Sequence, residues 1–426
     1  GHSHSDPRAY RTRAEEADWK KRDAPETFAK GLVALGLLKE AEVEGLEGSV
    51  QAKLDAAMDY SNKSAEPDKA ELTTDVFALS KFTQQDKAND EAWREKIRKG
   101  EVKREISYAQ ALAEAMREEM LRDDKVFILG EDVGLYGGAY GATRGLYEEL
   151  GENRVIDTPI SEATIGGAAV GAAMAGMRPV AEIMYVDFTP LAMDQVANQG
   201  AKNRYMFGGK TSVPMVVRSE GGAGRAIAAH HSQSLESLWT HFPGIYVVMP
   251  STPYDAKGLL KAAIRDDNPV MFIEHKMLYK EKGPVPEEDY IIPFGVADIK
   301  RPGKDLTIVT YSRMVLRALE AAEILAREGI DAEVIDLRTL APLDIDTVIT
   351  SIKKTGRFVG VTEAYENTSF INEVMAQINE LAFDWLDAPM VRVASANVPV
   401  PRAEVLEDLA IPNTNRIVEA CRKVVA

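Results

Sequence analysis

The stretch Arg154-Val-Ile-Asp-Thr-Pro-Ile-Ser-Glu162, which runs on into Ala163-Thr-Ile-Gly-Gly-Ala-Ala-Val-Gly-Ala-Ala-Met-Ala-Gly176, decides the fold class. A short apolar strand ends at Asp157, and Pro159 biases Thr158 towards an extended conformation. The Gly- and Ala-rich run that follows predicts a closely packed helix, too short and too glycine-rich to span a membrane. The stretch therefore predicts a strand–turn–helix junction, where open α/β sheets bind ligands.

Working outward from this junction, short apolar runs recur, and several are separated by enough residues for a crossover helix. Such runs alternating with helices predict parallel sheets covered on both faces. The runs of a first α/β domain, 105–300, are Val126-Phe-Ile-Leu129, Val180-Ala-Glu-Ile-Met184, Val213-Pro-Met-Val-Val217, Ile245-Tyr-Val-Val-Met249 and Val270-Met-Phe-Ile273. The runs of a second α/β domain, 301–426, are Leu306-Thr-Ile-Val309, Ala332-Glu-Val-Ile335 and Phe358-Val-Gly-Val361, with an amphipathic helix predicted over Val315–Glu328.

The N-terminal part of the chain has a different character. Residues 1–80 predict a mainly helical segment, because Pro25 suits a first helical turn and apolar residues recur at three- and four-residue steps from Val43 to Met58. Residues 81–104 mix charged and amide side chains with few apolar anchors, so we expect a solvated linker there. Ser107 then marks the start of a further helix.

Composition narrows the class of protein. The 426 residues include 51 Lys+Arg and 67 Asp+Glu, a formal net charge of −16, which argues against a nucleic-acid partner. The single cysteine, Cys421, excludes an intramolecular disulfide. We expect no membrane partner and a cytoplasmic location, since no apolar run reaches the ~18 residues of a membrane span and the start lacks a signal pattern. The absence of an initiator Met indicates processing or a longer polypeptide.

Two motifs outside the apolar runs are candidates for chemistry. Glu162 is expected in the first turn of its helix, where the helix dipole favours an anion, so it can serve either catalysis or the helix alone. His230 and His231 follow a glycine-rich segment, Gly221–Gly224, as expected of an active-site rim, although a purely structural role is also open. Adjacent side chains diverge, so this pair is not expected to bind one metal ion.

Together, these and further motifs closely resemble the β subunit of the thiamine-diphosphate-dependent dehydrogenase component of 2-oxo acid dehydrogenase complexes. The resemblance covers residues 104–426, while residues 1–80 resemble the end of the matching α subunit, as in fused αβ enzymes. It implies a pyrimidine-binding parallel-sheet domain, a transketolase-like C-terminal α/β domain and an N-terminal helical tail. The carrying motifs are Leu129-Gly-Glu-Asp132, Arg154–Glu162, Gly166–Gly176, Asp194-Gln195, His231-Ser-Gln233, Ala263-Ile-Arg-Asp266 with Asn268-Pro269, and Leu386-Asp-Ala-Pro389, with Gly1-His-Ser-His-Ser-Asp-Pro7 and Tyr10-Arg-Thr-Arg13 in the α-type part.

The resemblance also implies site residues. In the family, the glutamate that matches Glu162 hydrogen-bonds the aminopyrimidine ring of thiamine diphosphate and controls its protonation. Phe188 matches the aromatic residue that stacks near this ring, and Met184 lies close to the same site. His231 matches a histidine placed to handle protons or meet the lipoyl group, whereas His230 departs from the usual Gln.

Further implied residues contact the diphosphate and a cation. His2 matches an α-subunit histidine that contacts the diphosphate, and Ser3 matches a serine phosphorylated in animal pyruvate dehydrogenases. His4 is unusual in that loop. A monovalent-cation site, with K⁺ as the ion, is implied at Met215, Ala263, Ile264, Asp266 and Asn268. The turn Asp266-Asp-Asn-Pro269 alone is the alternative.

The family's Gly-Asp-Gly motif, which binds Mg²⁺ and the diphosphate, does not occur in the sequence. We therefore expect the chain to bind thiamine diphosphate weakly alone, and to need an α portion in a dimer of αβ units that also meets a lipoyl acyltransferase core. The expected reaction is decarboxylation of a 2-oxo acid, pyruvate first, with acyl transfer to a lipoyl group. Acetoin and branched-chain substrates remain open, as do a mainly docking role and a transketolase-type sugar reaction.

Overall fold

The computed structural model describes residues 10–426. His2, Ser3 and His4 lie outside the described residues. The chain divides into two units, Gly1–Leu72 and Thr73–Ala426, and each is described by itself. This boundary lies before residue 80, which is the end of the helical segment expected from the sequence.

The first unit is helical, as predicted. It contains α1 (Arg13–Lys20), α2 (Ala24–Ala34) and α3 (Glu40–Lys63), and α4 (Glu71–Thr74) crosses into the second unit. The apolar positions of α3 stay more than half exposed: Leu46, Val50, Leu54 and Met58. Among the described residues, no helix combines the length and the apolar character needed to cross a membrane.

Residues 81–104 contain a helix, α5 (Gln84–Arg98), so the expectation of a solvated linker is wrong. Thr83 caps this helix by accepting a hydrogen bond from the Asp86 backbone N–H at 3.2 Å. Trp93 and Ile97, one turn apart, pack against the core of the first α/β domain, and Asp90 is 1% exposed. Much of the buried face of this helix consists of charged side chains. The segment therefore has the polar composition of a linker although it is packed against the domain.

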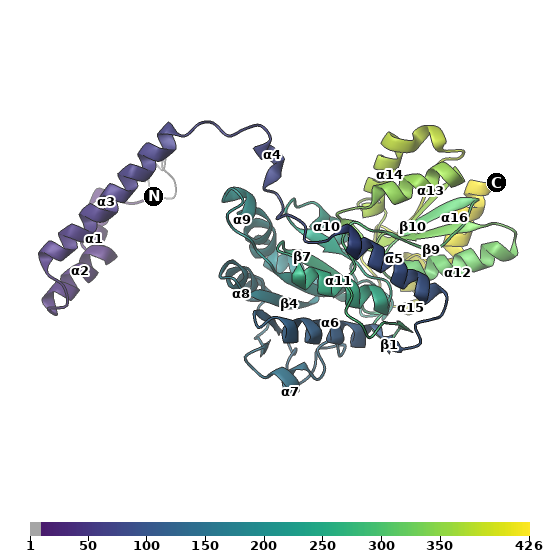
Figure 1. Cartoon of the computed structure of the whole chain (residues 1–426), viewed down its shortest axis with the longest axis horizontal. Helices are drawn as coiled ribbons and strands as arrows, with labels where there is room; N and C mark the ends of the chain where they lie inside the picture. Colours follow the sequence, from purple (N-terminus) through teal and green to yellow (C-terminus); the bar gives the residue numbers. More distant parts are fainter. Residues whose placement is uncertain (1–9) are drawn as a thin grey trace. The chain divides into compact units, whose positions relative to one another are not determined.

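The first α/β domain is built on a seven-stranded sheet of order β12-β6-β7-β5-β4-β2-β3. Figure 1 labels two of its strands, β4 and β7. Neighbouring strands are parallel except β12 and β6, which confirms the predicted parallel sheet. Its strands are β2 (Val126–Gly130), β3 (Val155–Asp157), β4 (Arg178–Tyr185), β5 (Val216–Gly221), β6 (Tyr246–Val248), β7 (Val270–His275) and β12 (Thr339–Ala341). A small antiparallel pair, β1 (Glu105–Ser107) and β8 (Lys282–Pro284), stands apart from it.

Helices cover both faces of this sheet. On β4, Val180 packs into the core shared with α6 (Tyr108–Arg122) and α11 (Pro253–Arg265), whereas Ala181 faces the core shared with α8 (Glu162–Met174). This alternation explains why consecutive positions of the strand, Val180 and Ala181, are both apolar. The remaining helices are α7 (Leu146–Leu150), the 3₁₀ turn η1 (Val186–Ala192), the π-helical η2 (Asp194–Gly200), α9 (Ala201–Met206), the 3₁₀ turn η3 (Ala229–His231) and α10 (Glu236–Thr240).

The second α/β domain has a five-stranded sheet of order β14-β13-β10-β11-β9, parallel except for β9. Its strands are β9 (Asp298–Arg301), β10 (Leu306–Thr310), β11 (Ala332–Asp336), β13 (Phe358–Tyr365) and β14 (Val391–Ser395). Its helices are α12 (Met314–Arg327), α13 (Ile345–Thr355), α14 (Phe370–Ala382), the 3₁₀ turn η4 (Phe383–Trp385), α15 (Glu404–Ala410) and α16 (Thr414–Val425). Strand β12 leaves this domain and pairs with β6 of the first sheet, so the two domains share a strand connection.

Alanine substitutions at two glycines with positive φ allow the cost of backbone strain to be compared with the cost of a steric clash. A Cβ at Gly244 (φ +94°) would lie 2.0 Å from the Ala201 carbonyl oxygen, whereas a Cβ at Gly145 (φ +84°) would meet nothing within 4 Å. We expect Gly145→Ala to lower the free energy of unfolding by about 1–2 kcal/mol. Gly244→Ala should lower it by about 2–5 kcal/mol, because overpacking adds to the strain. Thermal unfolding of both variants checks this, and equal losses would contradict it.

Candidate active site

Glu162 begins helix α8, directly after the predicted strand–turn–helix junction. Strand β3 ends at Asp157, and the Thr158 backbone N–H donates to the Gly130 carbonyl at 2.9 Å, which ties the turn to the end of β2. The Glu162 side chain is half-buried in the first helical turn. Its carboxylate therefore lies at the carboxyl edge of the parallel sheet, where the helix dipole stabilises negative charge.

A second carboxylate lies beside it, and the sequence analysis assigned it no role. Glu131 follows β2, and burial raises its pKa, with the nearby Glu162 charge adding to the shift. Its Oε1 atom is buried and has no hydrogen-bond partner among the described residues. Both side chains are half-buried, and the charge of Glu162 is close enough to oppose ionisation of Glu131. The motif Leu129-Gly-Glu-Asp132 contained the signal, but the sequence could not place the two carboxyls side by side.

The aromatic residue predicted for the site, Phe188, lies against the predicted histidine, His231. The His231 ring, on η3, lies edge-on to Phe188 of η1, with 5.4 Å between ring centroids. It also lies edge-on to Tyr185 at 4.7 Å, a contact that the sequence analysis missed. Phe188 is half-buried, as is Met184 at the end of β4. Helix α8 packs against η1 closely enough that a Cβ at Gly166 would lie 3.0 Å from Ala192, so the Glu162 helix and the Phe188 turn are neighbours.

A buried polar cluster contacts the backbone of His231. Lys276 donates to the His231 carbonyl and to the Gly222 carbonyl, and its Nζ lies 3.5 Å from Glu220. Tyr140 donates to Glu220 at 3.0 Å and lies 3.2 Å from the Tyr185 hydroxyl. Burial raises the pKa of Glu220 to about 8 against the opposing charge of Lys276.

His230 differs from His231 in exposure. His230 is exposed, whereas His231 is half-buried among aromatic rings. The two neighbouring histidine side chains therefore lie in different surroundings. Among residues 10–426, no cluster of three or more His, Cys, Asp or Glu side chains is arranged to bind a metal ion.

The residues predicted for a monovalent cation lie around one turn, and several of their oxygens already accept hydrogen bonds. Asp266 Oδ1 accepts from the backbone and side-chain N–H groups of Asn268, at 2.8 and 2.7 Å. Arg178 donates to the Ile264 carbonyl at 2.7 Å, and the Met215 carbonyl accepts from Val270 at 2.9 Å. Ala263 is buried beside them. These contacts describe the turn that the sequence analysis gave as the alternative.

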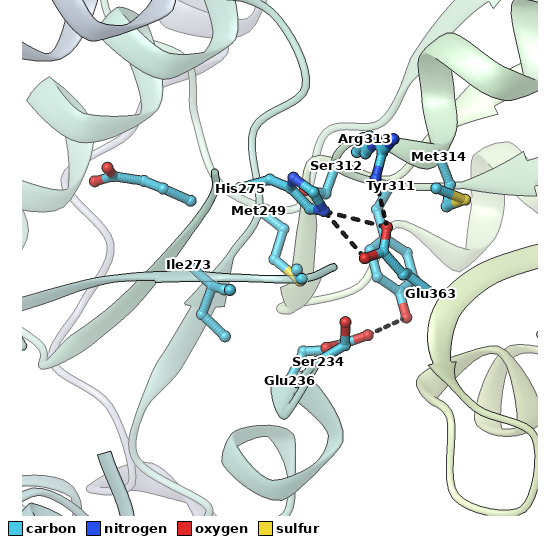
Figure 2. A pocket seen from close by; sticks show the side chains of 13 residues that line it. Ser234, Glu236, Met249, Ile273, His275, Tyr311, Ser312, Arg313, Met314 and Glu363 are labelled. Atoms are coloured by element: carbon cyan, nitrogen blue, oxygen red, sulfur yellow. Dashed lines mark hydrogen bonds and ion pairs between the residues drawn. The ribbon is translucent and has the colours of Figure 1, made fainter. Parts of the chain in front are cut away.

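A further buried group lies where the two α/β domains meet (Figure 2). His275, at the end of β7, contacts both carboxylate oxygens of Glu363 on β13, at 3.1 and 3.2 Å. Burial opposes the charge of Glu363, but His275, Arg313 and the Ala223 N–H together hold its pKa at about 2. Beside this pair, Tyr311 donates to Glu236 at 2.7 Å. The pocket that these residues line has a volume of about 20 Å³, enough for one water molecule.

Comparison with known protein families agrees with this architecture. Residues 104–282 match the family "Transketolase, pyrimidine binding domain", and residues 295–417 match "Transketolase, C-terminal domain". Residues 1–70 match "Dehydrogenase E1 component". A solved structure described as a split-gene transketolase, an inactive β4 tetramer, covers 75% of this chain and 98% of its own, with a TM-score of 0.62 and 23% identity. That likeness supports the fold.

Three curated relatives are much closer in sequence. The β subunit of acetoin:2,6-dichlorophenolindophenol oxidoreductase from Cupriavidus necator is 52% identical over 75% of this chain and 97% of its own length. The β subunit of 2-oxoisovalerate dehydrogenase from Bacillus subtilis is 48% identical over 75% and 98%. The pyruvate dehydrogenase E1 component subunit β from Rhizobium meliloti is 47% identical over 75% and 70%.

The fold and the junction at Glu162 thus define a protein of the transketolase type, with a pyrimidine-binding domain followed by a C-terminal domain. The chain belongs to the β subunits of the thiamine-dependent 2-oxo acid and acetoin dehydrogenases, and it carries an E1-type segment in front of the β part.

The residues around Glu162 fit the cofactor of this class, thiamine diphosphate, which supplies the carbanion chemistry when bound. An aminopyrimidine ring needs hydrogen-bonding groups at its edge and an apolar face beside it. Buried oxygens without partners among the described residues, Glu131 Oε1 and Gln195 Oε1, are available for the edge. Gln195 packs against α8, since a Cβ at Gly167 would lie 3.4 Å from it. Phe188 and Met184 can supply the apolar face.

Proposed function

We propose that the chain forms the pyrimidine side of the active site of a thiamine-diphosphate-dependent dehydrogenase that cleaves a 2-oxo acid and passes the acyl group to a lipoyl acceptor. The observation that carries the proposal is the half-buried Glu162 at the start of α8, near Glu131, whose buried Oε1 atom has no hydrogen-bond partner among the described residues. Pyruvate is the favoured substrate. We place the enzyme in the cytoplasm.

Each residue has a distinct role in this proposal. Glu162 hydrogen-bonds the aminopyrimidine ring nitrogen and holds a proton there. Glu131, whose Oε1 atom has no partner among the described residues, is available to the edge of the same ring. Phe188 and Met184 hold the ring in place. His231, at the rim and flanked by Tyr185, serves the proton transfers that accompany acyl transfer to the lipoyl group.

We propose that the diphosphate and Mg²⁺ are bound chiefly by an α portion, in a dimer of αβ units. The Gly-Asp-Gly motif is absent from this sequence, and the exposed apolar row of α3 gives the E1-type segment a surface for such a partner. His2 contributes to the diphosphate side. We further propose that a K⁺ ion binds near Met215 and Asn268. The assembly also docks to a lipoyl acyltransferase core.

The division of the site predicts weak cofactor binding by the isolated chain. Added α portion should tighten thiamine diphosphate binding at least 100-fold in the presence of Mg²⁺, since the most highly charged part of the cofactor gains its ligands. Isothermal titration with and without the α portion measures this, and EDTA should remove the gain. Tight, Mg²⁺-dependent binding by the isolated chain would overturn the division.

Acetoin cleavage is the second candidate, favoured by the 52% identity to the Cupriavidus necator acetoin oxidoreductase β subunit. Branched-chain 2-oxo acids are the third, given the 48% identity to a 2-oxoisovalerate dehydrogenase subunit. Dye-coupled oxidation by the assembly with its α portion, compared across pyruvate, acetoin and branched-chain 2-oxo acids, decides among them. Activity with none of these substrates would favour a mainly docking role, and transfer between sugar phosphates would favour the transketolase-type alternative.

A further inference from the structure

The loop that leads to His231 is bound by a carboxylate of the C-terminal domain. Glu407, on α15, accepts hydrogen bonds from the backbone N–H groups of Gly224 and Ala226, both at 2.9 Å. Glu407 is 2% exposed, whereas Glu404 on the same short helix is exposed. A carboxylate is costly to bury unless it is hydrogen-bonded, so these two contacts account for the position of Glu407.

The same domain binds the preceding residue of the loop through both of its backbone groups. Glu363 accepts from the Ala223 N–H at 2.5 Å, and Arg313 donates to the Ala223 carbonyl at 3.1 Å. Figure 2 shows Glu363 between His275 and Arg313, with its carboxylate directed towards both. A side chain at Gly224 would lie 2.5 Å from Arg313, so the loop fits closely against this domain.

The loop backbone requires such restraint. Ala226 and Ala228 adopt φ values of 53° and 68°, in the left-handed region that L-residues disfavour. Strained backbone of this kind persists when surrounding contacts over-determine it. Loss of the Glu407 contacts therefore allows the loop to relax, and His231 then moves relative to Tyr185 and Phe188, although Lys276 still binds its carbonyl.

We propose that Glu407 is a positioning residue for acyl transfer: through the Gly224 and Ala226 N–H groups, it holds the loop in the conformation that presents His231 to the lipoyl acceptor. The inference rests on the proposed function, in which His231 serves that transfer. Glu407 acts through the backbone and touches neither substrate nor cofactor.

The test compares two acceptors in the full assembly with its α portion. Glu407→Gln keeps the side-chain shape but replaces one accepting oxygen by an NH₂ group, so one backbone N–H loses its partner. We expect lipoyl-domain reduction to fall tenfold or more in kcat, with little change in the KM for the oxo acid. Dye-coupled oxidation, which bypasses the lipoyl group, should stay within twofold. The exposed control Glu404→Gln should leave both rates unchanged.

A further variant, His231→Ala, separates failure of the proposed role of His231 from failure of the positioning role of Glu407. If His231→Ala leaves lipoyl-domain reduction unchanged, the proposed role of His231 fails, whatever Glu407 does. If His231→Ala is defective and Glu407→Gln is not, the positioning role is overturned. Equal losses with both acceptors in Glu407→Gln would overturn it as well, because they indicate a general structural defect.

Ala226→Gly covers the case in which Glu407→Gln does not fold. It removes a buried methyl group but keeps the N–H that donates to Glu407, and it widens the conformations open to the loop. The same selective loss with the lipoyl acceptor is expected, on a smaller scale, and unchanged rates with both acceptors would contradict the proposal.

Discussion

Replacement of Glu162 by Gln is expected to lower the turnover of the assembly by about 10²- to 10⁴-fold, the range that general acid–base catalysis contributes. Glutamine keeps the size and hydrogen-bonding reach of the side chain but cannot supply a proton to the aminopyrimidine ring. Initial rates of dye-coupled oxidation at saturating cofactor measure the loss. Since Glu162 is half-buried and begins a helix, the amide should leave folding and assembly intact.

Glu152→Gln is the matched control. Glu152 is exposed and lies shortly before β3, outside the junction, so its replacement should leave turnover within twofold of the parent. Sedimentation of both variants with the α portion reports assembly. Unchanged turnover in Glu162→Gln with intact assembly would refute the role of Glu162 and favour the docking interpretation.

The features that were predictable from the sequence are those that depend on residues close together in the chain. Strands β2, β7 and β10 begin where the predicted apolar runs begin, and the helix predicted over Val315–Glu328 is found at Met314–Arg327 because its apolar stripe and Gly329 mark it locally. The junction at Glu162 was predictable for the same reason, because Pro159 and the glycine-rich run follow the strand directly.

Contacts between distant segments were not predictable. His275 and Glu363 are 88 residues apart, and neither belongs to a motif singled out from the sequence. Strand β12 was missed because it is short and pairs across domains. The Glu407 contacts join residues more than 180 positions apart, and nothing near Glu407 in the sequence indicates that it binds a loop. Such pairs depend on how two sheets are brought together.

Helix α5 is the clearest case in which distant contacts decide the structure. It lies between the segments that match known families, 1–70 and 104–282, and its buried face carries charge. Asp90 contacts Arg338 of the C-terminal domain at 3.0 Å and accepts from the Tyr254 hydroxyl at 2.9 Å. Arg94, one turn later, contacts Asp298 at 3.1 Å. The helix therefore binds both α/β domains at once.

Asp90→Ala is expected to destabilise this unit by about 3 kcal/mol, because it removes one partner from a buried ion pair. Arg338 is fully buried and keeps its contacts with the carboxylates of Asp255, at 2.8 Å, and Asp298, at 3.6 Å. The thermal midpoint should fall by roughly 5 °C in a protein of this size.

The exposed neighbour Glu91 provides the control, and Glu91→Ala should change the midpoint by less than ~1 °C, as is usual for a surface substitution. Asp90→Asn distinguishes charge from packing: it retains a carbonyl oxygen for Arg338 and Tyr254, so a loss close to that of Asp90→Ala assigns the effect to the charge. If Asp90→Ala and Glu91→Ala unfold at the same temperature, α5 does not stabilise the domains, and the segment acts as the linker that its composition suggests.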